Sequence, residues 1–313
     1  MTRTDWMTND IPSLKGRNIV VTGANSGIGY RAAGVLAAKG AHVILACRNP
    51  ERGEDAVHDI MHDFPHANIA LALLDLASLA SVHSFADELL ARDMPLHVLI
   101  NNAGVMTPPK RLETQDGFEL QFGTNVLGHF ALTARLMPAL ERAGEARIVT
   151  LASIAHKRGR IDFDDLQSLK SYSPMGAYAQ SKLGDLMFAF ELDRRLRAAG
   201  SPILSVAAHP GVAATNLFRA GDYNGLEKAA RDAFTPLIGW LLNSDAAGAF
   251  ATLYAATAET VQSGGYYGPQ GLFEARGQRV GKAQVAPQAR DPAVAARLWE
   301  ACEALTGVKV SFG

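Results

Sequence analysis

The chain has 313 residues, of which 48% are hydrophobic and 19% are charged, enough to bury a large core in one α/β domain or in two domains. Its 30 Lys and Arg residues nearly balance its 31 Asp and Glu residues, which argues against a dedicated nucleic-acid-binding protein. The two cysteines, Cys47 and Cys302, exclude a disulfide framework and a thiol-ligated metal cluster, so we expect a metal-free protein in a reducing compartment.

Residues 1–16 mix charged and polar side chains where a signal peptide would need an apolar stretch. The longest mildly apolar stretch, residues 246–258, is too short to span a bilayer. No run of Pro, Ser or Gly is typical of an interdomain linker. We therefore expect one domain over residues 1–313, located in the cytoplasm and without a membrane-spanning segment.

Short, continuous apolar runs alternate with longer amphipathic segments along the chain. Continuous apolar character is typical of strands covered on both faces, as in a parallel sheet. We expect strands at residues 18–22, 42–46, 69–74, 98–101, 147–151, 203–207 and 266–267, and helices near 27–39, 51–63, 79–92, 119–142, 176–199 and 245–257. This alternation predicts a Rossmann-like α/β fold: a doubly wound parallel sheet of about seven strands with helices on both faces, and ligands beyond the carboxyl ends of the strands.

The segment TGANSGIG, residues 22–29, lies between the first strand and the first helix. Glycines here let the chain turn tightly and bring backbone N–H groups against a diphosphate at the helix N-terminus. The segment lacks the Lys of a P-loop, which disfavours ATP or GTP hydrolysis. The residues expected to contact a dinucleotide here are Gly23, Asn25, Ser26, Gly27, Ile28 and Gly29.

The spacing TGxxxGxG resembles that of the short-chain dehydrogenase/reductase family, in its short single-domain branch. The segment NNAG at 101–104, Ser153 at a strand end and the pair Tyr178 and Lys182 fit the same resemblance. The segments LACRNPERG, NVLGHFALT, SIAHKRGRIDFDDL and LWEACEALTG further resemble the retinol-dehydrogenase-like branch, over about residues 10–310. The resemblance implies an oxidoreductase that uses a nicotinamide dinucleotide.

The second strand is followed by Arg48, and no carboxylate occurs at residues 46–49. An acidic residue there would bind the ribose 2′-hydroxyl of NAD(H), whereas the planar fork of Arg48 suits a 2′-phosphate. The sequence therefore favours NADP(H), with NAD(H) as the alternative if Arg48 is merely solvated at the strand end.

Further cofactor contacts follow from the resemblance alone. It implies that Asp75 contacts the adenine amino group, although Asp75 is also a candidate cap for the helix that begins near Ser78. It implies that Asn101 ties neighbouring strands together. The remaining implied contacts are Leu76, Asn102, Ala103, Gly104, Pro210, Gly211, Val212 and Thr215.

Tyr178 and Lys182 are four residues apart, so they share one face of the helix predicted near 176–199. A nearby ammonium favours the phenolate and lowers the tyrosine pKa from its usual value of about 10. By resemblance, Tyr178 is the acid/base, Ser153 donates a hydrogen bond to the substrate oxygen, Lys182 also binds the nicotinamide ribose, and Asn125 holds a water in a proton relay. No metal site is expected.

These features predict hydride transfer between a nicotinamide and a carbonyl or alcohol substrate. Residues 216–243 are apolar in part and are expected to form a substrate lid, which suggests a lipophilic small-molecule substrate. The alternatives are that residues 237–242 seat a helix on the core, or that the segment is a surface for a membrane or a partner. Residues 270–313 are expected to be a C-terminal extension. The family resemblance also suggests a homodimer or homotetramer built through the helices near 119–142 and 176–199. The alternative function is that of a nucleotide-sensing or regulatory protein of the same fold with little turnover.

Overall fold

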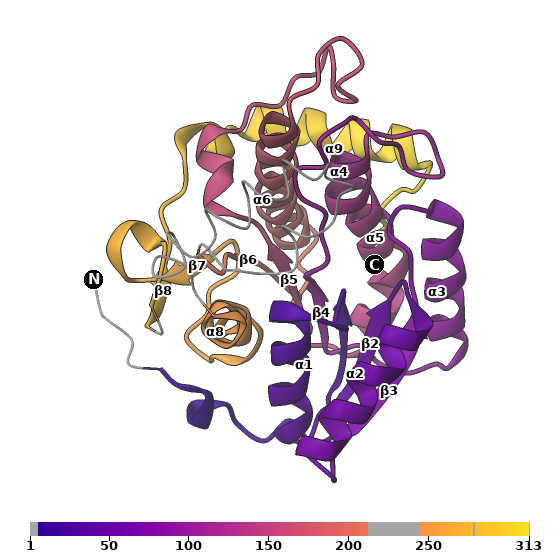
Figure 1. The fold of residues 1–313 in the computed structure, drawn as a ribbon, viewed down its shortest axis with the longest axis vertical. Helices are drawn as coiled ribbons and strands as arrows, with labels where there is room; N and C mark the ends of the chain where they lie inside the picture. The colour runs from indigo at the N-terminus through magenta and orange to yellow at the C-terminus, as the bar shows by residue number, and fades with distance from the viewer. Residues whose placement is uncertain (1–5, 212–243, 278, 313) are drawn as a thin grey trace, which may run out of the picture.

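One sheet organises the computed structural model, which describes residues 6–211, 244–277 and 279–312 (Figure 1). Its order is β3-β2-β1-β4-β5-β6-β7-β8, and β8 alone of these strands runs antiparallel to its neighbour. The strands are β1 (Asn18–Thr22), β2 (His42–Cys47), β3 (Asn68–Leu73), β4 (Val98–Asn101), β5 (Arg147–Leu151), β6 (Leu204–Ala208), β7 (Tyr266–Pro269) and β8 (Val280–Lys282).

The predicted doubly wound, Rossmann-like fold is confirmed, with one strand more than the seven expected. β8 has only three residues, Val-Gly-Lys, and its pattern carries no apolar run by which a strand could be recognised. The order of the strands reverses direction between β1 and β4. In open sheets of this kind, that reversal opens a crevice at the carboxyl ends of the strands.

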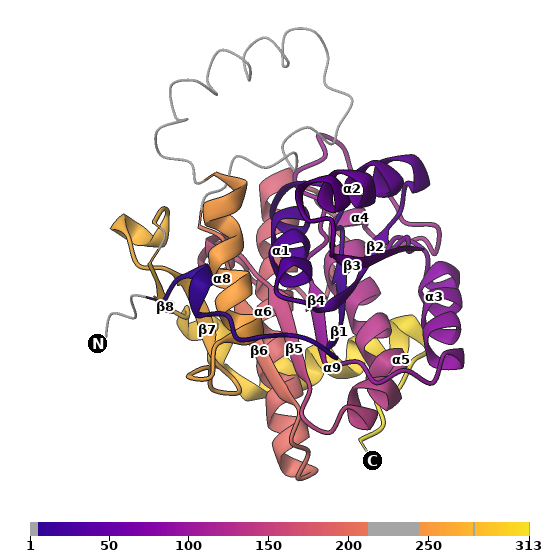
Figure 2. The same ribbon diagram turned by 90° about the horizontal axis from the view of Figure 1, so that it is seen from below.

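Helices cover both faces of the sheet (Figure 2). One face carries α1 (Gly27–Ala38), α2 (Pro50–Asp63) and α8 (Asp245–Thr257), and the other carries α3 (Leu79–Ala91), α5 (Gly128–Arg142) and α6 (Pro174–Ala198). The last helix, α9 (Pro292–Thr306), packs on α6. Among the described residues, no helix is both long enough and apolar enough to span a membrane.

The central strand β1 shows why the apolar runs are continuous. Ile19, Val20 and Val21 are all fully buried, but successive side chains point to opposite faces of the sheet. Val20 therefore belongs to the core under α3, α5 and α6, whereas Ile19 and Val21 belong to the core under α1, α2 and α8. Each apolar strand residue thus contributes to one of two cores.

The helix predicted over 119–142 is interrupted. It consists of the single turn α4 (Leu120–Phe122), the π-helical turn η2 (Gly123–Leu127) and α5. A π-helical turn is wider than an α-helical one and shifts the register of the side chains that follow it. Asn125 lies within that turn, so the turn determines which way this residue points.

The C-terminal helix α9 was not recognised in the sequence pattern. Its Trp299 is 2% exposed, stacks on Phe188 with ring centroids 5.9 Å apart and meets Phe130 edge-on at 5.0 Å.

The helix α6, through which a subunit interface was predicted, is covered within the chain: its residues 177–189 are all buried. A subunit interface through this stretch of α6 would therefore require other parts of the same chain to move, and the oligomeric state stays a prediction.

Replacing Trp299 with Ala should lower the free energy of unfolding by about 3–5 kcal/mol, because it removes the largest side chain that joins α9 to α5 and α6. Urea denaturation followed by circular dichroism measures the change. Leu272, which is 76% exposed, provides the control: Leu272→Ala should change stability by less than about 0.5 kcal/mol. Equal effects of the two substitutions would contradict the role given to α9.

Candidate functional site

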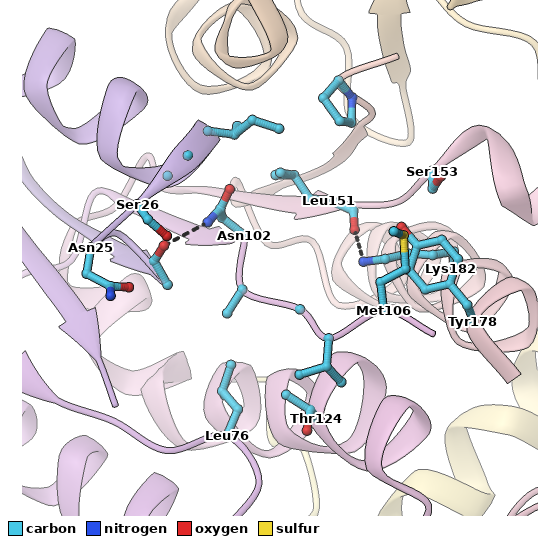
Figure 3. A pocket seen from close by; sticks show the side chains of 18 of the residues that line it. Asn25, Ser26, Leu76, Asn102, Met106, Thr124, Leu151, Ser153, Tyr178 and Lys182 are labelled. Atoms are coloured by element: carbon cyan, nitrogen blue, oxygen red, sulfur yellow. Dashed lines mark hydrogen bonds between the residues drawn. The ribbon is translucent and has the colours of Figure 1, made fainter. Parts of the chain in front are cut away.

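A cavity of about 470 Å³ opens at the carboxyl ends of β1, β2, β4 and β5, at the point where the strand order reverses (Figure 3). Tyr178, Lys182 and Ser153 lie at one end of it, and the side chains of Asn25 and Ser26 lie at the other. Predicted site residues that line it are Gly23, Asn25, Ser26, Gly27, Ile28, Gly29, Arg48, Asp75, Leu76, Asn102, Ala103, Gly104, Ser153, Tyr178, Lys182, Pro210 and Gly211.

Three predicted residues are not among them. Asn125 is fully buried behind the cavity wall. Val212 and Thr215, like the lid expected at 216–243, lie outside the described residues. Within the residues that are described, no three His, Cys, Asp or Glu side chains gather as a metal site would require.

The glycine-rich turn has the geometry that a diphosphate needs. Gly23 and Gly27 have φ of 62° and 60°, where side chains other than hydrogen are disfavoured. A Cβ on Gly29 would lie 2.4 Å from Nδ2 of Asn102 and 2.8 Å from the carbonyl oxygen of Gly23. Ser26, the N-cap of α1, makes no side-chain hydrogen bond to the first turn, so the N–H groups there are available to an anion.

The far end of the cavity is lined by exposed arginines. Arg48 follows β2 and Arg52 lies in the first turn of α2, and both side chains reach the cavity. Asn49, the N-cap of α2, accepts a hydrogen bond of 2.8 Å from the backbone N–H of Arg52. This end of the cavity therefore presents two guanidinium groups. The one carboxylate within residues 46–52, that of Glu51, does not line the cavity.

Asp75 does not cap α3, although its residue type allowed that interpretation. The N-cap is Ser78, whose side chain accepts from the N–H of Ser81 at 3.3 Å. Asp75 instead accepts from the N–H of Ala77 at 3.0 Å, within the turn that follows β3. It lines the cavity in that position, and the adenine contact implied for it stays a prediction.

The hydroxyl of Thr22 joins the ends of β1 and β4. Its Oγ1 accepts hydrogen bonds of 2.9 Å from the N–H groups of both Asn102 and Ala103, and Nδ2 of Asn102 donates to the Thr22 carbonyl at 2.7 Å. The expectation that Asn101 ties the strands is wrong, because its side-chain amide donates to Thr133 of α5 at 3.0 Å. Side chains of successive residues alternate across the sheet, and so Asn102 reaches β1 while Asn101 reaches the helices.

His129 was not predicted as a site residue, yet it holds the π-helical turn to β1. Its Nδ1 lies 2.8 Å from the carbonyl oxygen of Asn125, and its Nε2 lies 2.9 Å from Oγ1 of Thr22. Burial lowers the pKa of His129 to about 3, so the ring is neutral. A carbonyl can only accept, so Nδ1 carries the proton and Nε2 accepts from the Thr22 hydroxyl.

The Asn125 side chain is used to fasten neighbouring segments together. Its Oδ1 accepts from the N–H of Val105 at 2.8 Å, and its Nδ2 donates to the Val105 carbonyl at 3.1 Å and to Oγ of Ser181 at 2.9 Å. Ser181 in turn donates to the Tyr178 carbonyl at 2.9 Å. These contacts connect the loop after β4 with α6, and the water relay implied for Asn125 stays a prediction.

Tyr178 and Lys182 share the face of α6 that meets the cavity. They are 7% and 5% exposed, and Nζ of Lys182 lies 6.0 Å from the centre of the Tyr178 ring. Nζ donates to the Leu151 carbonyl at 2.9 Å and to Oδ2 of Asp185 at 2.8 Å. Burial works against the ammonium, but Asp185 and Tyr178 raise the pKa of Lys182 above its usual value, so it is charged at neutral pH.

Ser153 stands at the end of β5 as the N-cap of the short helix η3 (Ile154–Arg158). Its Oγ accepts from the N–H of Ala155 at 3.1 Å, which leaves its own proton to donate to a bound molecule. Behind it, the wholly buried His156 lies 2.6 Å from the Ser153 carbonyl and accepts from the N–H of Ala286 at 3.2 Å. The serine backbone is thus connected to the C-terminal part of the chain.

The family model for short chain dehydrogenases matches residues 17–222, which include the glycine turn, Asn125, Ser153, Tyr178 and Lys182. The chain belongs to the short-chain dehydrogenase family. As a family member with dehydrogenase relatives over most of its length, it is an NAD(P)-dependent oxidoreductase that acts on alcohol and carbonyl groups. The resemblance to the retinol-dehydrogenase-like branch is confirmed by those relatives.

Two curated relatives illustrate the branch. Retinol dehydrogenase 13 of Mus musculus is 40% identical over 306 residues, which cover 96% of this chain and 87% of that protein. Polyprenol dehydrogenase of Mus musculus is 41% identical over 311 residues, which cover 97% of this chain and 88% of that protein.

Two solved structures are similar to this short-chain dehydrogenase. The crystal structure of an uncharacterised protein from Mycobacterium paratuberculosis superimposes with a TM-score of 0.80 and 40% identity, covering 99% of this chain and 100% of that one. The active-site complex of Pseudomonas aeruginosa RhlG with NADP has a TM-score of 0.61 and 25% identity, covering 81% of this chain and 94% of that one.

Replacing Gly29 with Ala should weaken NADP(H) binding by about tenfold or more and lower stability by about 1–3 kcal/mol, since the new Cβ would displace Asn102 and the Gly23 backbone. Fluorescence titration with NADPH and thermal unfolding measure the two effects. Gly34→Ala in the same helix is the matched control, because its Cβ would meet its nearest neighbours at 3.7 and 3.8 Å. That variant should bind NADPH as the wild type does; equal losses in both variants would contradict the prediction.

Proposed function

We propose that this short-chain dehydrogenase is an NADP(H)-preferring oxidoreductase that interconverts a lipophilic alcohol and its carbonyl compound. One observation carries the proposal: a glycine turn and Arg48 line one end of a cavity whose other end brings together Tyr178, Lys182 and Ser153. The nicotinamide of the bound cofactor supplies or accepts the hydride. The cavity residues that fit a dinucleotide are those of the glycine turn, whose geometry excludes a side chain on Gly29.

The proton moves through Tyr178. In the reductive direction its phenol donates a proton to the substrate oxygen, and in the oxidative direction its phenolate accepts one. The Lys182 ammonium favours the phenolate, and Ser153 donates a hydrogen bond to the oxygen on which negative charge develops. Tyr178 and Lys182 are 7% and 5% exposed, and this burial strengthens their electrostatic interaction.

The preference for NADP(H) rests on Arg48. Its guanidinium lies at the end of β2, where it can bind a 2′-phosphate through two parallel N–H groups. The similarity to RhlG, whose structure contains NADP, is consistent with this choice. Arg52 lies on the same side of the cavity and adds a second positive charge.

Two features support a lipophilic substrate. The wall of the cavity near Tyr178 contains the apolar side chains of Met106, Ile154 and Met175, which offer contact area to a hydrocarbon. The names of two relatives, retinol dehydrogenase and polyprenol dehydrogenase, refer to long apolar alcohols. We therefore propose that chain length and apolar surface, rather than charge, determine which carbonyl compounds bind.

Replacing Tyr178 with Phe should lower turnover by roughly 100- to 10,000-fold while leaving NADP(H) binding nearly unchanged, because only the proton donor is removed. Oxidation of NADPH, followed by its absorbance across a panel of aliphatic and aromatic aldehydes and ketones, measures turnover. Near wild-type rates in the variant would refute the acid/base role. Tight NADPH binding by the wild type with no oxidation across the panel would instead favour a nucleotide-sensing protein.

Replacing Arg48 with Asp should reverse cofactor preference, lowering kcat/KM for NADPH relative to NADH by at least about tenfold, the contribution of one charge-assisted hydrogen bond. The aspartate would repel the 2′-phosphate and bind the free 2′-hydroxyl of NADH. Arg290→Asp changes the same charge at an exposed residue that does not line the cavity, and should leave the ratio unaltered. An unchanged ratio in the Arg48 variant would exclude this arginine as the selectivity residue.

A further inference from the structure

Asp185 lies about one turn after Lys182 along α6, whereas Tyr178 lies about one turn before it. The spacing of the three residues, 178, 182 and 185, places them on one face of the helix. Asp185 is 2% exposed and does not line the cavity. It is therefore too deeply buried to touch a substrate, yet its carboxylate meets the ammonium of Lys182 directly.

The contact determines where the ammonium can point. An ammonium has three N–H donors. One donates to Oδ2 of Asp185 at 2.8 Å and another to the Leu151 carbonyl at 2.9 Å. Both acceptors belong to buried parts of the structure. They therefore fix the direction of the third N–H group, although the side chain of the lysine is itself flexible.

The contact also cancels charge. A lone ammonium would stabilise the Tyr178 phenolate with its full positive charge. A neutral ammonium–carboxylate pair stabilises the phenolate less. Among the described residues, the other titratable groups that act on this pair or on Tyr178 are Cys302 of α9, His129 of α5 and Tyr266 of β7. Burial raises the pKa of Cys302 and of Tyr266 and lowers that of His129 to about 3, so all three are neutral near pH 7.

We propose that Asp185 is a positioning residue that holds the Lys182 ammonium and offsets its charge, and thereby sets the pH at which Tyr178 exchanges its proton. The proposal rests on the function proposed for Tyr178 and Lys182. Asp185 does not touch the reacting atoms; it acts through the lysine.

The carboxylate can lose its effect within the range of ordinary assays. Burial raises the pKa of Asp185 to about 6, although Lys182 works in the opposite direction. Above this pH the pair is neutral, and below it the ammonium is left uncompensated. Acidification should therefore strengthen the attraction of Lys182 for the Tyr178 phenolate.

Asp185→Asn tests the proposal, because asparagine keeps an oxygen that accepts from Lys182 but carries no charge. The pKa of Tyr178 should fall by about one unit or more, since a negative charge near the phenolate is removed. In the protein without cofactor, ultraviolet difference titration of the phenolate measures this shift, with Tyr178→Phe added to each background so that the other tyrosines can be subtracted. The acidic limb of alcohol oxidation and the basic limb of carbonyl reduction should move to lower pH by the same amount.

Asp193→Asn is the matched control. Asp193 lies on the same helix, is also 2% exposed and is paired with Arg197, but it does not line the cavity or contact Lys182. Its substitution should leave the phenolate titration unchanged even if stability falls. If Asp185→Asn does not fold, Asp185→Ser removes the same charge with a smaller side chain and carries the same test.

A titration curve that coincides with the wild type in a folded Asp185 variant overturns the proposal, as does an equal shift in the Asp193 variant. Because the titration needs no substrate, it separates this proposal from the proposed function. A shifted phenolate titration in the Asp185 variant, together with a wild-type protein that shows no turnover, would support the role of Asp185 and contradict the enzymatic function. Normal turnover with an unshifted phenolate would do the reverse.

Discussion

The hydroxyl of Thr22 is the contact on which the geometry of the site depends. It stands at the carboxyl end of β1, accepts the N–H groups of Asn102 and Ala103 from the chain after β4, and donates to the neutral ring of His129. β1 and β4 are paired in the sheet, and the strand order reverses between them, so a crevice opens beyond their carboxyl ends. The Thr22 side chain therefore extends the attachment of the two strands beyond their ladder and fastens the start of the loop after β4 to the end of β1.

Burial gives such contacts their value. A buried polar group without a partner costs about 1–3 kcal/mol, and this cost makes each alternative arrangement of Thr22, His129 and Asn125 unfavourable. The apolar strand residues contribute stability, but they do little to fix the orientation of individual side chains, because hydrophobic burial is non-directional. The two cores hold the sheet between its helices, and the polar contacts at the strand ends decide where each site residue points.

Much of this arrangement follows from the sequence by local rules. Continuous apolar runs predicted the parallel strands, since Ile19, Val20 and Val21 of β1 are each buried in one of two cores. Glycine spacing predicted the turn at 22–29, and the interval between Tyr178 and Lys182 predicted their common helical face. β8 and α9 were not predicted, because short or moderately apolar segments are stabilised by partners distant in the sequence. Trp299 of α9, for example, packs on Phe130 and Phe188. The π-helical turn at Asn125 depends likewise on His129 and Thr22, which no local pattern connects.

A continuous path of hydrogen bonds connects the two ends of the cavity. It runs from Thr22, beside the glycine turn, through His129 and the backbone and side chain of Asn125 to Ser181, which lies between Tyr178 and Lys182 on α6. Hydride transfer requires that the nicotinamide and the proton donor meet the same substrate carbon and oxygen, and small displacements cost large factors in rate. The glycine-turn end and the Tyr178 end of the cavity are attached to one buried network. A dinucleotide held at the glycine turn is therefore positioned relative to Tyr178 by the protein interior and not by the cavity walls alone.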